Sequence, residues 1–163
     1  MESIQTKIRL KKKKKLMNII NHVFSMDETT INFSGDKNET YFKVIENSFI
    51  SAISGKSNLS DEVKKMKGLS GRKFRVMMNY LIKNFENPKY LEIGSWLGSS
   101  ACSVCFNNKV NITCIDDWSQ NFSTNLDSKK IFKGNLKKFL NEHNSPQIIE
   151  KDFRKVNFKN IQN

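Results

Sequence analysis

The sequence predicts an α/β protein whose core is a parallel sheet, and three observations support this. Between Lys89 and Glu150, short apolar segments typical of strands alternate with helical segments, in the order strand, helix, strand, helix, strand. Helical segments also precede the first strand, and a turn containing Gly94 and Gly98 joins that strand to its helix. Strands that alternate with helices form parallel sheets through right-handed crossovers. We therefore expect the N-terminal half of a doubly wound parallel sheet with strand order 3-2-1, preceded by helices.

The length and composition indicate one folded domain with an N-terminal extension. The chain has 163 residues, of which 37% are hydrophobic and 12 are Phe, and this is enough apolar material for a single core. Residues 1–40 contain a lysine run, a short amphipathic segment and then polar residues with little periodicity. We therefore expect a basic, partly disordered N-terminal arm at residues 1–40 and a folded domain at residues 41–163.

The net charge of +12 raises the question of nucleic-acid binding, so the position of the charge matters. Seven of the 28 basic residues lie between Lys7 and Lys15, and the others are spread thinly along the chain. Lysine outnumbers arginine by 24 to 4, and asparagine is also abundant, which is more typical of a coding bias than of a phosphate-binding surface. The pattern does not favour nucleic-acid binding, which stays an alternative function.

Cysteine content and hydropathy indicate a protein of the reducing cytoplasm. Three cysteines are too few for a disulfide framework, and no stretch reaches the length of about 18 apolar residues that a membrane span needs. The basic run imitates a signal peptide, but Asn18, Asn21 and His22 interrupt the apolar segment that follows it. We therefore expect a cytoplasmic protein with no membrane partner.

Two helices are predicted before the first strand. From Tyr41 to Ile53 apolar residues recur at three- and four-residue spacing, which indicates a helix that stops near Gly55. A second helix is predicted to begin after Ser70, its expected N-cap, and to stop before Pro88. Its apolar stripe comprises Phe74, Met77, Met78, Leu81, Ile82 and Phe85.

Three cations crowd the first turn of this second helix, where the helix dipole disfavours positive charge. They are Arg72, Lys73 and Arg75. One interpretation is a solvated face, and the other is a turn that faces an anionic group. The sequence leaves both interpretations open.

The elements after the second helix change from helical spacing to short apolar runs. Strands are predicted at residues 89–94, 110–115 and 147–150. The small and apolar segment 99–106 is predicted to form a helix packed tightly on the sheet. Residues 129–143 are predicted to form another helix, whose inward side chains are Ile131, Leu136, Phe139 and Leu140.

The turn after the first strand is the place where an open α/β sheet normally contacts a ligand. A dinucleotide fingerprint has three glycines in this turn, and the middle one lets backbone amides approach a pyrophosphate. Here Trp96 occupies the middle position, and Glu92 places a carboxylate at the strand tip. A carboxylate repels a pyrophosphate and attracts a ligand with an ammonium or sulfonium charge. These residues favour S-adenosylmethionine as the cofactor, and an NAD-type dinucleotide-binding oxidoreductase stays an alternative.

Acidic residues also follow the second and third predicted strands. Asp116 and Asp117 come directly after Ile115, at a distance from Glu92 that suits one strand-helix-strand unit. An acid at this place can accept hydrogen bonds from both ribose hydroxyls. Asp152 follows the third strand, where it would face the same crevice and could meet an adenine amino group.

The runs YLEIGSWLGSSA, ITCIDDW and IIEKDF resemble class I S-adenosylmethionine-dependent methyltransferases, especially the small-molecule O-methyltransferase branch that includes catechol O-methyltransferase. The resemblance covers residues 66–158 and is most specific over residues 90–118. It implies a Rossmann-like fold and the transfer of a methyl group to a small-molecule acceptor. It also implies a set of cofactor-binding residues, namely Glu92, Gly94, Ser95, Trp96, Gly98, Ser100, Asp116, Asp117, Trp118, Asp152 and Phe153.

The resemblance assigns these residues to different parts of S-adenosylmethionine. Glu92 and Ser100 would hold the aminocarboxylate end, which the turn from Gly94 to Gly98 would line. Asp116 would hold the ribose. The adenine would be surrounded by Trp118, Asp152 and Phe153.

The chain departs from this family after the third strand. Family members continue with a fourth strand beside the first, and its tip supplies the acid that handles metal, substrate or proton transfer. This sequence ends at Asn163, before such a strand. We therefore expect a cofactor-binding fragment that is inactive by itself, and we assign no catalytic residue. The first strand would then form an open sheet edge, which predicts self-association.

No metal site is predicted. Cys102 and Cys105 form a CxxC pair inside the predicted packed helix, with no second pair to complete a zinc site, and are interpreted as core thiols. His22 and His143 lie far apart in the sequence, and neither is near a cluster of metal ligands. Both are interpreted as surface or structural residues.

Overall fold

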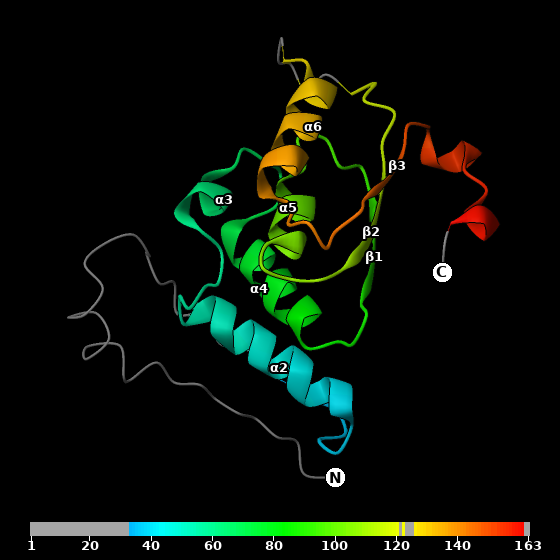
Figure 1. Cartoon of the computed structure of the whole chain (residues 1–163). Helices are drawn as coiled ribbons and strands as arrows, with labels where there is room; N and C mark the ends of the chain where they lie inside the picture. The colour runs from blue at the N-terminus through cyan, green and yellow to red at the C-terminus, as the bar shows by residue number, and fades with distance from the viewer. Residues whose placement is uncertain (1–32, 121, 123–125, 162–163) are drawn as a thin grey trace. The chain divides into compact units, whose positions relative to one another are not determined.

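The computed structural model describes residues 33–120, 122 and 126–161 of the chain (Figure 1). The lysine run, His22 and the remainder of residues 1–32 lie outside this part, so the predicted arm is described only from Phe33 onward. The chain divides into two compact units between Glu46 and Asn47. In the described part of the first unit, the rings of Phe33 and Phe42 meet edge to face, with centroids 6.5 Å apart.

All seven predicted helices and strands are present. In chain order they are α2 (Thr40–Ile53), α4 (Arg72–Lys83), β1 (Lys89–Ile93), α5 (Ser99–Cys105), β2 (Asn111–Ile115), α6 (Ser128–Phe139) and β3 (Gln147–Ile149). Three short elements were not predicted, namely α3 (Asp61–Lys65) and the 3-10 turns η2 (Phe153–Lys155) and η3 (Phe158–Asn160). Elements this short contain too few residues for a hydrophobic period to show in the sequence.

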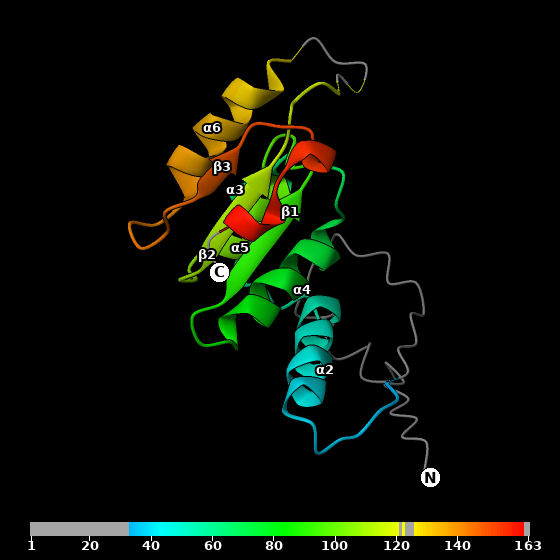
Figure 2. The same ribbon diagram turned by 90° about the vertical axis from the view of Figure 1, so that its right-hand side faces the viewer.

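The three strands form a parallel sheet in the order β1-β2-β3, which confirms the predicted α/β class. In the register of β1 on β2, Lys89 lies opposite Asn111 and Ile93 lies opposite Ile115. Helices α4, α5 and α6 lie on one side of the sheet, and the turns η2 and η3 lie on the other (Figures 1 and 2). Because the three strands are parallel, their carboxyl ends lie together at the same end of the sheet.

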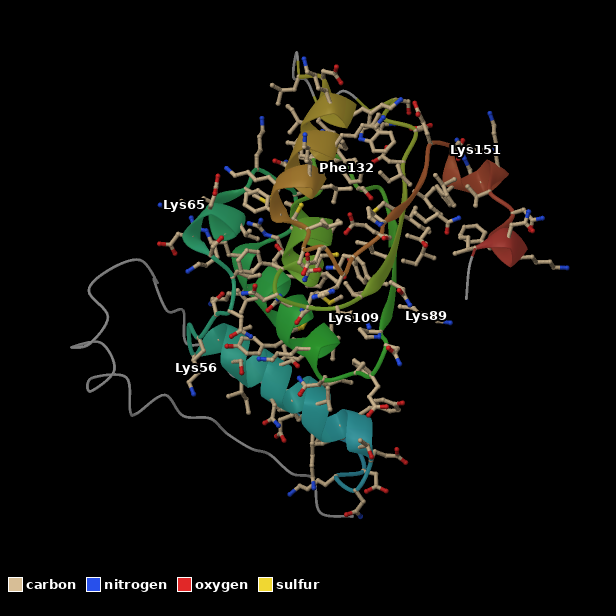
Figure 3. The ribbon with its side chains drawn as sticks, in the orientation of Figure 1. Lys56, Lys65, Lys89, Lys109, Phe132 and Lys151 are labelled. Carbon is tan, nitrogen blue, oxygen red and sulfur yellow. The ribbon has the colours of Figure 1, made fainter. Side chains whose placement is uncertain are left out.

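Helix α5 lies at the centre of the core, in contact with α3, α4, α6 and β2. Its small side chains allow this close packing, and Ala101, Cys102, Val104 and Cys105 are fully buried. The interpretation of Cys102 and Cys105 as core thiols is confirmed, because both are free and burial raises the pKa of each to about 12. Phe132 points inward from α6 to this core (Figure 3).

The predicted N-cap of α4 was wrong, and its predicted apolar stripe was right only in part, with Met77 and Ile82 buried as predicted. Gly71, not Ser70, is the N-cap, and the Ser70 hydroxyl lies 3.1 Å from the Ser100 hydroxyl instead. Phe74 is 49% exposed, whereas Val76 is buried. The buried face therefore extends from the predicted stripe toward Val76 and leaves out Phe74, because α4 packs against α3 as well as α5.

Arg75 fits neither interpretation of the cations in the first turn of α4. Its guanidinium is buried and donates hydrogen bonds to the backbone carbonyls of Val63, Lys64 and Met66, at 3.2, 3.0 and 3.3 Å. These carbonyls belong to the C-terminal end of α3, which has a negative partial charge. Arg75 therefore caps a neighbouring helix, while Arg72 and Lys73 are exposed.

The inward face of α6 also differs from the prediction. Phe132 is fully buried and Ile131 is only partly buried, while Leu136 is buried as predicted. The helix ends at Phe139, and the following Leu140 is its C-cap. Phe139 and Leu140 are partly buried and pack against the core.

Candidate functional site

A pocket of about 360 Å³ lies at the carboxyl ends of the three strands. Seven of the eleven residues predicted to bind a cofactor line it: Gly94, Trp96, Asp116, Asp117, Trp118, Asp152 and Phe153. The loops that follow β1, β2 and β3 all contribute to its wall. The structure therefore brings together residues that are up to about 60 positions apart in the sequence.

The loop after β1 turns sharply because of its backbone conformation. Gly94 and Gly98 have φ values of +82° and +81°, and Trp96 between them has φ of +43°. Residues other than glycine rarely adopt this left-handed backbone conformation, so Trp96 needs stabilising contacts. Its indole N–H donates to the Ser128 hydroxyl at 3.1 Å, at the start of α6. Trp96 is buried, and its ring lies 5.1 Å from that of Phe122.

The loop after β2 is tied to the loop after β1. Asp116 accepts hydrogen bonds from the backbone amides of Trp96 and Trp118, both at 2.7 Å. The Trp118 indole N–H donates to the Trp96 carbonyl at 2.9 Å. Two of these hydrogen bonds join the loops after β1 and β2, and the third lies within the loop after β2.

The other two acids of the pocket have partners on their own loops. Asp117 accepts hydrogen bonds from the amide and the hydroxyl of Ser119, at 3.0 and 2.7 Å, which hold its pKa below the usual range. Asp152 forms a two-pronged ion pair with the Arg154 guanidinium, which lowers its pKa to about 2. Both acids are therefore charged at neutral pH.

Glu92 lies on the helix-covered side of β1 and is only 8% exposed. Its Oε2 accepts a hydrogen bond from the Tyr90 hydroxyl at 3.0 Å, whereas Oε1 has no hydrogen-bond partner of normal geometry. Burial raises its pKa to about 7; the Tyr90 hydrogen bond and the nearby Ser95 hydroxyl lower it, and the Asp116 charge raises it further. The Ser95 hydroxyl is also buried without a partner of normal geometry.

The four predicted residues that do not line the pocket lie around α5. They are Glu92, Ser95, Gly98 and Ser100. Gly98 is the N-cap of α5, and a Cβ atom there would lie 2.9 Å from the Phe132 ring, so this close approach requires glycine. Ser100 is half-buried and contacts Ser70.

Sequence reasoning missed the part of the wall that precedes α4. Leu69 lines the pocket and is 73% exposed. A Cβ atom at Gly68 would overlap the Ser99 hydroxyl, so this glycine lets the Leu69 loop approach α5. The Lys67 ammonium lies 5.8 Å from the Trp96 ring. The sequence did contain a signal for this part of the wall, namely a leucine between Gly68 and Gly71. An apolar side chain in a glycine-rich loop is often left at the surface, where it can contact a ligand.

Other kinds of site find no support within the described residues. They contain no group of three or more His, Cys, Asp or Glu side chains that could hold a metal ion. None of their helices is long and apolar enough to cross a membrane. His143 is exposed, 3.7 Å from Glu142.

Comparison of the chain with protein-family models, with curated proteins and with solved structures gives no match.

Proposed function

We propose that this chain is the cofactor-binding portion of an S-adenosylmethionine-dependent methyltransferase that acts on a small-molecule acceptor. The observation that carries the proposal is the convergence of the loops after β1, β2 and β3 on one pocket, with acids on two of them and a buried acid beside the third. Ligands of open α/β sheets bind at this end of the strands. The proposal includes a Rossmann-like sheet in which β1, β2 and β3 form one half.

The cationic end of the cofactor fits the surroundings of Glu92. Among the described residues, Glu92 Oε1 and the Ser95 hydroxyl are buried polar atoms without a hydrogen-bond partner of normal geometry, which is costly unless a ligand uses them. Glu92 directly precedes Ile93 and Gly94, which line the pocket. Gly94 leaves open space, because a Cβ atom there would meet nothing within 4 Å. A positively charged ligand group near Gly94 would stabilise the Glu92 carboxylate.

The nucleoside end fits the other walls of the pocket. The loop after β2 offers carboxylate acceptors for ribose hydroxyls, and Trp118 and Phe153 offer rings that can contact a flat base. The pocket volume of about 360 Å³ lies within the range of about 300–1,000 Å³ usual for small-molecule sites. When bound, the cofactor supplies a methyl group on a positively charged sulfur. The side chain of Trp96 and the carboxylates disfavour the pyrophosphate of NAD.

Calorimetric titration of the chain with S-adenosylmethionine, S-adenosylhomocysteine and NAD tests the proposal. We expect both sulfur ligands to bind more tightly than NAD. Glu92→Gln should weaken binding of S-adenosylmethionine about tenfold or more, because it removes a charged acceptor. Glu86→Gln, on an exposed residue outside the pocket, is the matched control and should leave binding unchanged. Tighter binding of NAD, or equal effects of the two variants, would contradict the proposal.

A further inference from the structure

The two consecutive acids after β2 have different surroundings, although both line the pocket. Each carboxylate oxygen of Asp116 already accepts a backbone amide at 2.7 Å, one from Trp96 and one from Trp118. These are short, charge-assisted hydrogen bonds. Asp116 is partly buried, whereas Asp117 is exposed.

The two amides that Asp116 binds belong to residues with unfavourable backbone conformations. Trp96 and Trp118 have φ values of +43° and +50°. A bulky residue persists in this region only when surrounding contacts hold it there. Asp116 supplies such a contact at both residues, and the hydrogen bond from the Trp118 indole to the Trp96 carbonyl adds a third. Asp116 therefore holds the shape of two pocket walls.

Of the two acids, Asp117 is the one with a carboxylate oxygen that is available to a ligand. Both Ser119 hydrogen bonds end on its Oδ1, and no described residue donates a hydrogen bond to its Oδ2. The charges around it are those of Asp152 and Arg154, which face the same pocket. An exposed carboxylate with a free oxygen can accept two ligand hydroxyls without giving up an internal contact.

We propose that Asp117 accepts the ribose hydroxyls of a nucleoside ligand, and that Asp116 is a positioning residue that clamps the loops after β1 and β2. This inference rests on the proposed function, because it assumes that the ligand contains a nucleoside. It changes the role that the family resemblance gives to Asp116.

The test compares adenosine with 2′,3′-dideoxyadenosine, which lacks both ribose hydroxyls. Each is titrated into the wild-type chain, Asp117→Ala, Asp116→Asn and the control Glu86→Ala. The chain has two tryptophans, and both line the pocket, so their fluorescence reports ligand binding and the state of the clamp. Thermal melting is recorded for every variant.

We expect the wild-type chain and Glu86→Ala to prefer adenosine by about tenfold or more. Asp117→Ala should lose this preference without a change in melting temperature. Asp116→Asn should melt at a lower temperature, shift its tryptophan emission to longer wavelength and bind both ligands more weakly, while it keeps the preference. If Asp116→Asn does not fold, Trp118→Phe breaks a single contact of the clamp and should lower the melting temperature to a smaller extent, while it keeps the preference for adenosine.

Two results would overturn the inference. Asp117→Ala that keeps the preference would show that Asp117 does not bind the hydroxyls. Asp116→Asn with unchanged melting and emission would show that there is no clamp. A third result would overturn the proposed function together with the role of Asp117: wild-type protein that binds neither adenosine, nor dideoxyadenosine, nor either sulfur ligand. In that case the melting temperature and the tryptophan emission of Asp116→Asn would still test the clamp.

Discussion

At the scale of single residues, Glu92 illustrates how burial changes an acid. Burial raises the pKa of its carboxyl group to about 7, whereas the pKa of a glutamate carboxyl group in water is near 4.5. The cause is the loss of water around the charged form, which the hydrogen bond from Tyr90 and the nearby Ser95 hydroxyl offset only in part. The folded protein therefore holds a proton at Glu92 that the unfolded chain has already lost at pH 6.

This proton makes stability depend on pH. Between about pH 4.5 and pH 7 the folded state binds more protons than the unfolded chain. The free energy of unfolding should therefore fall as pH rises through this window, by about 3 kcal/mol in total, and level off above pH 7. Asp152, whose pKa is lowered to about 2, acts only below this window. Glu92→Gln should remove most of the slope. Urea unfolding of both proteins at several pH values measures it, and equal slopes would contradict the assignment.

At the scale of elements, buried amide side chains hold the end of α5. Asn79 donates to the carbonyls of Ser103 and Phe106, both at 2.8 Å. Asn108 donates to the Val104 carbonyl at 2.9 Å, and Asn144 to the Cys105 carbonyl at 3.3 Å. The last carbonyls of a helix have no partner within the helix, so these side chains satisfy them from α4 and from later loops. The abundance of asparagine, interpreted from the sequence as a coding bias, thus includes residues with a structural role.

Arg75 has the same role for α3 and provides a test at this scale. Arg75→Met should destabilise the protein by about 1–3 kcal/mol, because the carbonyls of Val63, Lys64 and Met66 lose their donors. Arg72→Met, on the exposed side of the same turn, should change stability by no more than about 0.5 kcal/mol. Urea unfolding monitored by circular dichroism measures both. A cost for Arg72→Met as large as that for Arg75→Met would show that the lost charge matters and the capping does not.

At the scale of the whole molecule, one face of the sheet carries no α-helix among the residues that the structure describes. Parallel sheets normally have both faces covered. Tyr90 packs on the core, so its neighbours Leu91 and Ile93 point to the other face, where they are 44% and 48% exposed. Strand β1 pairs only with β2 among the described strands, which leaves its outer edge open. Such an edge pairs readily with another chain.

We expect two copies of the chain to associate through β1. Antiparallel pairing centred on Leu91 would place Tyr90 opposite Glu92 and Lys89 opposite Ile93 of the second copy, with no like charges facing each other. Leu91→Lys should therefore shift sedimentation velocity profiles toward the monomer. Phe74→Lys removes a similarly exposed apolar side chain outside the sheet, so it should leave the sedimentation profiles unchanged. A wild-type chain that sediments as a monomer at every concentration would contradict this expectation.

The sequence by itself determined the α/β class, the order of the seven longer elements and the loops that form the pocket. These features depend on local patterns: the change from helical to short apolar spacing, the glycines at positions 94 and 98, and acids placed directly after strands. Seven of the eleven predicted site residues meet at the pocket because the carboxyl ends of parallel strands share one edge.

Only the tertiary structure decided which partner each polar group has. Asp116 binds the amide of Trp96, Arg75 binds the end of α3, and Gly68 lets a loop approach Ser99, although the partners are distant in the sequence. No local pattern encodes such contacts, because they depend on how helices rotate and how closely loops approach when the core packs. The difference between Asp116 and Asp117 likewise follows from which of the two carboxylates meets the neighbouring loop.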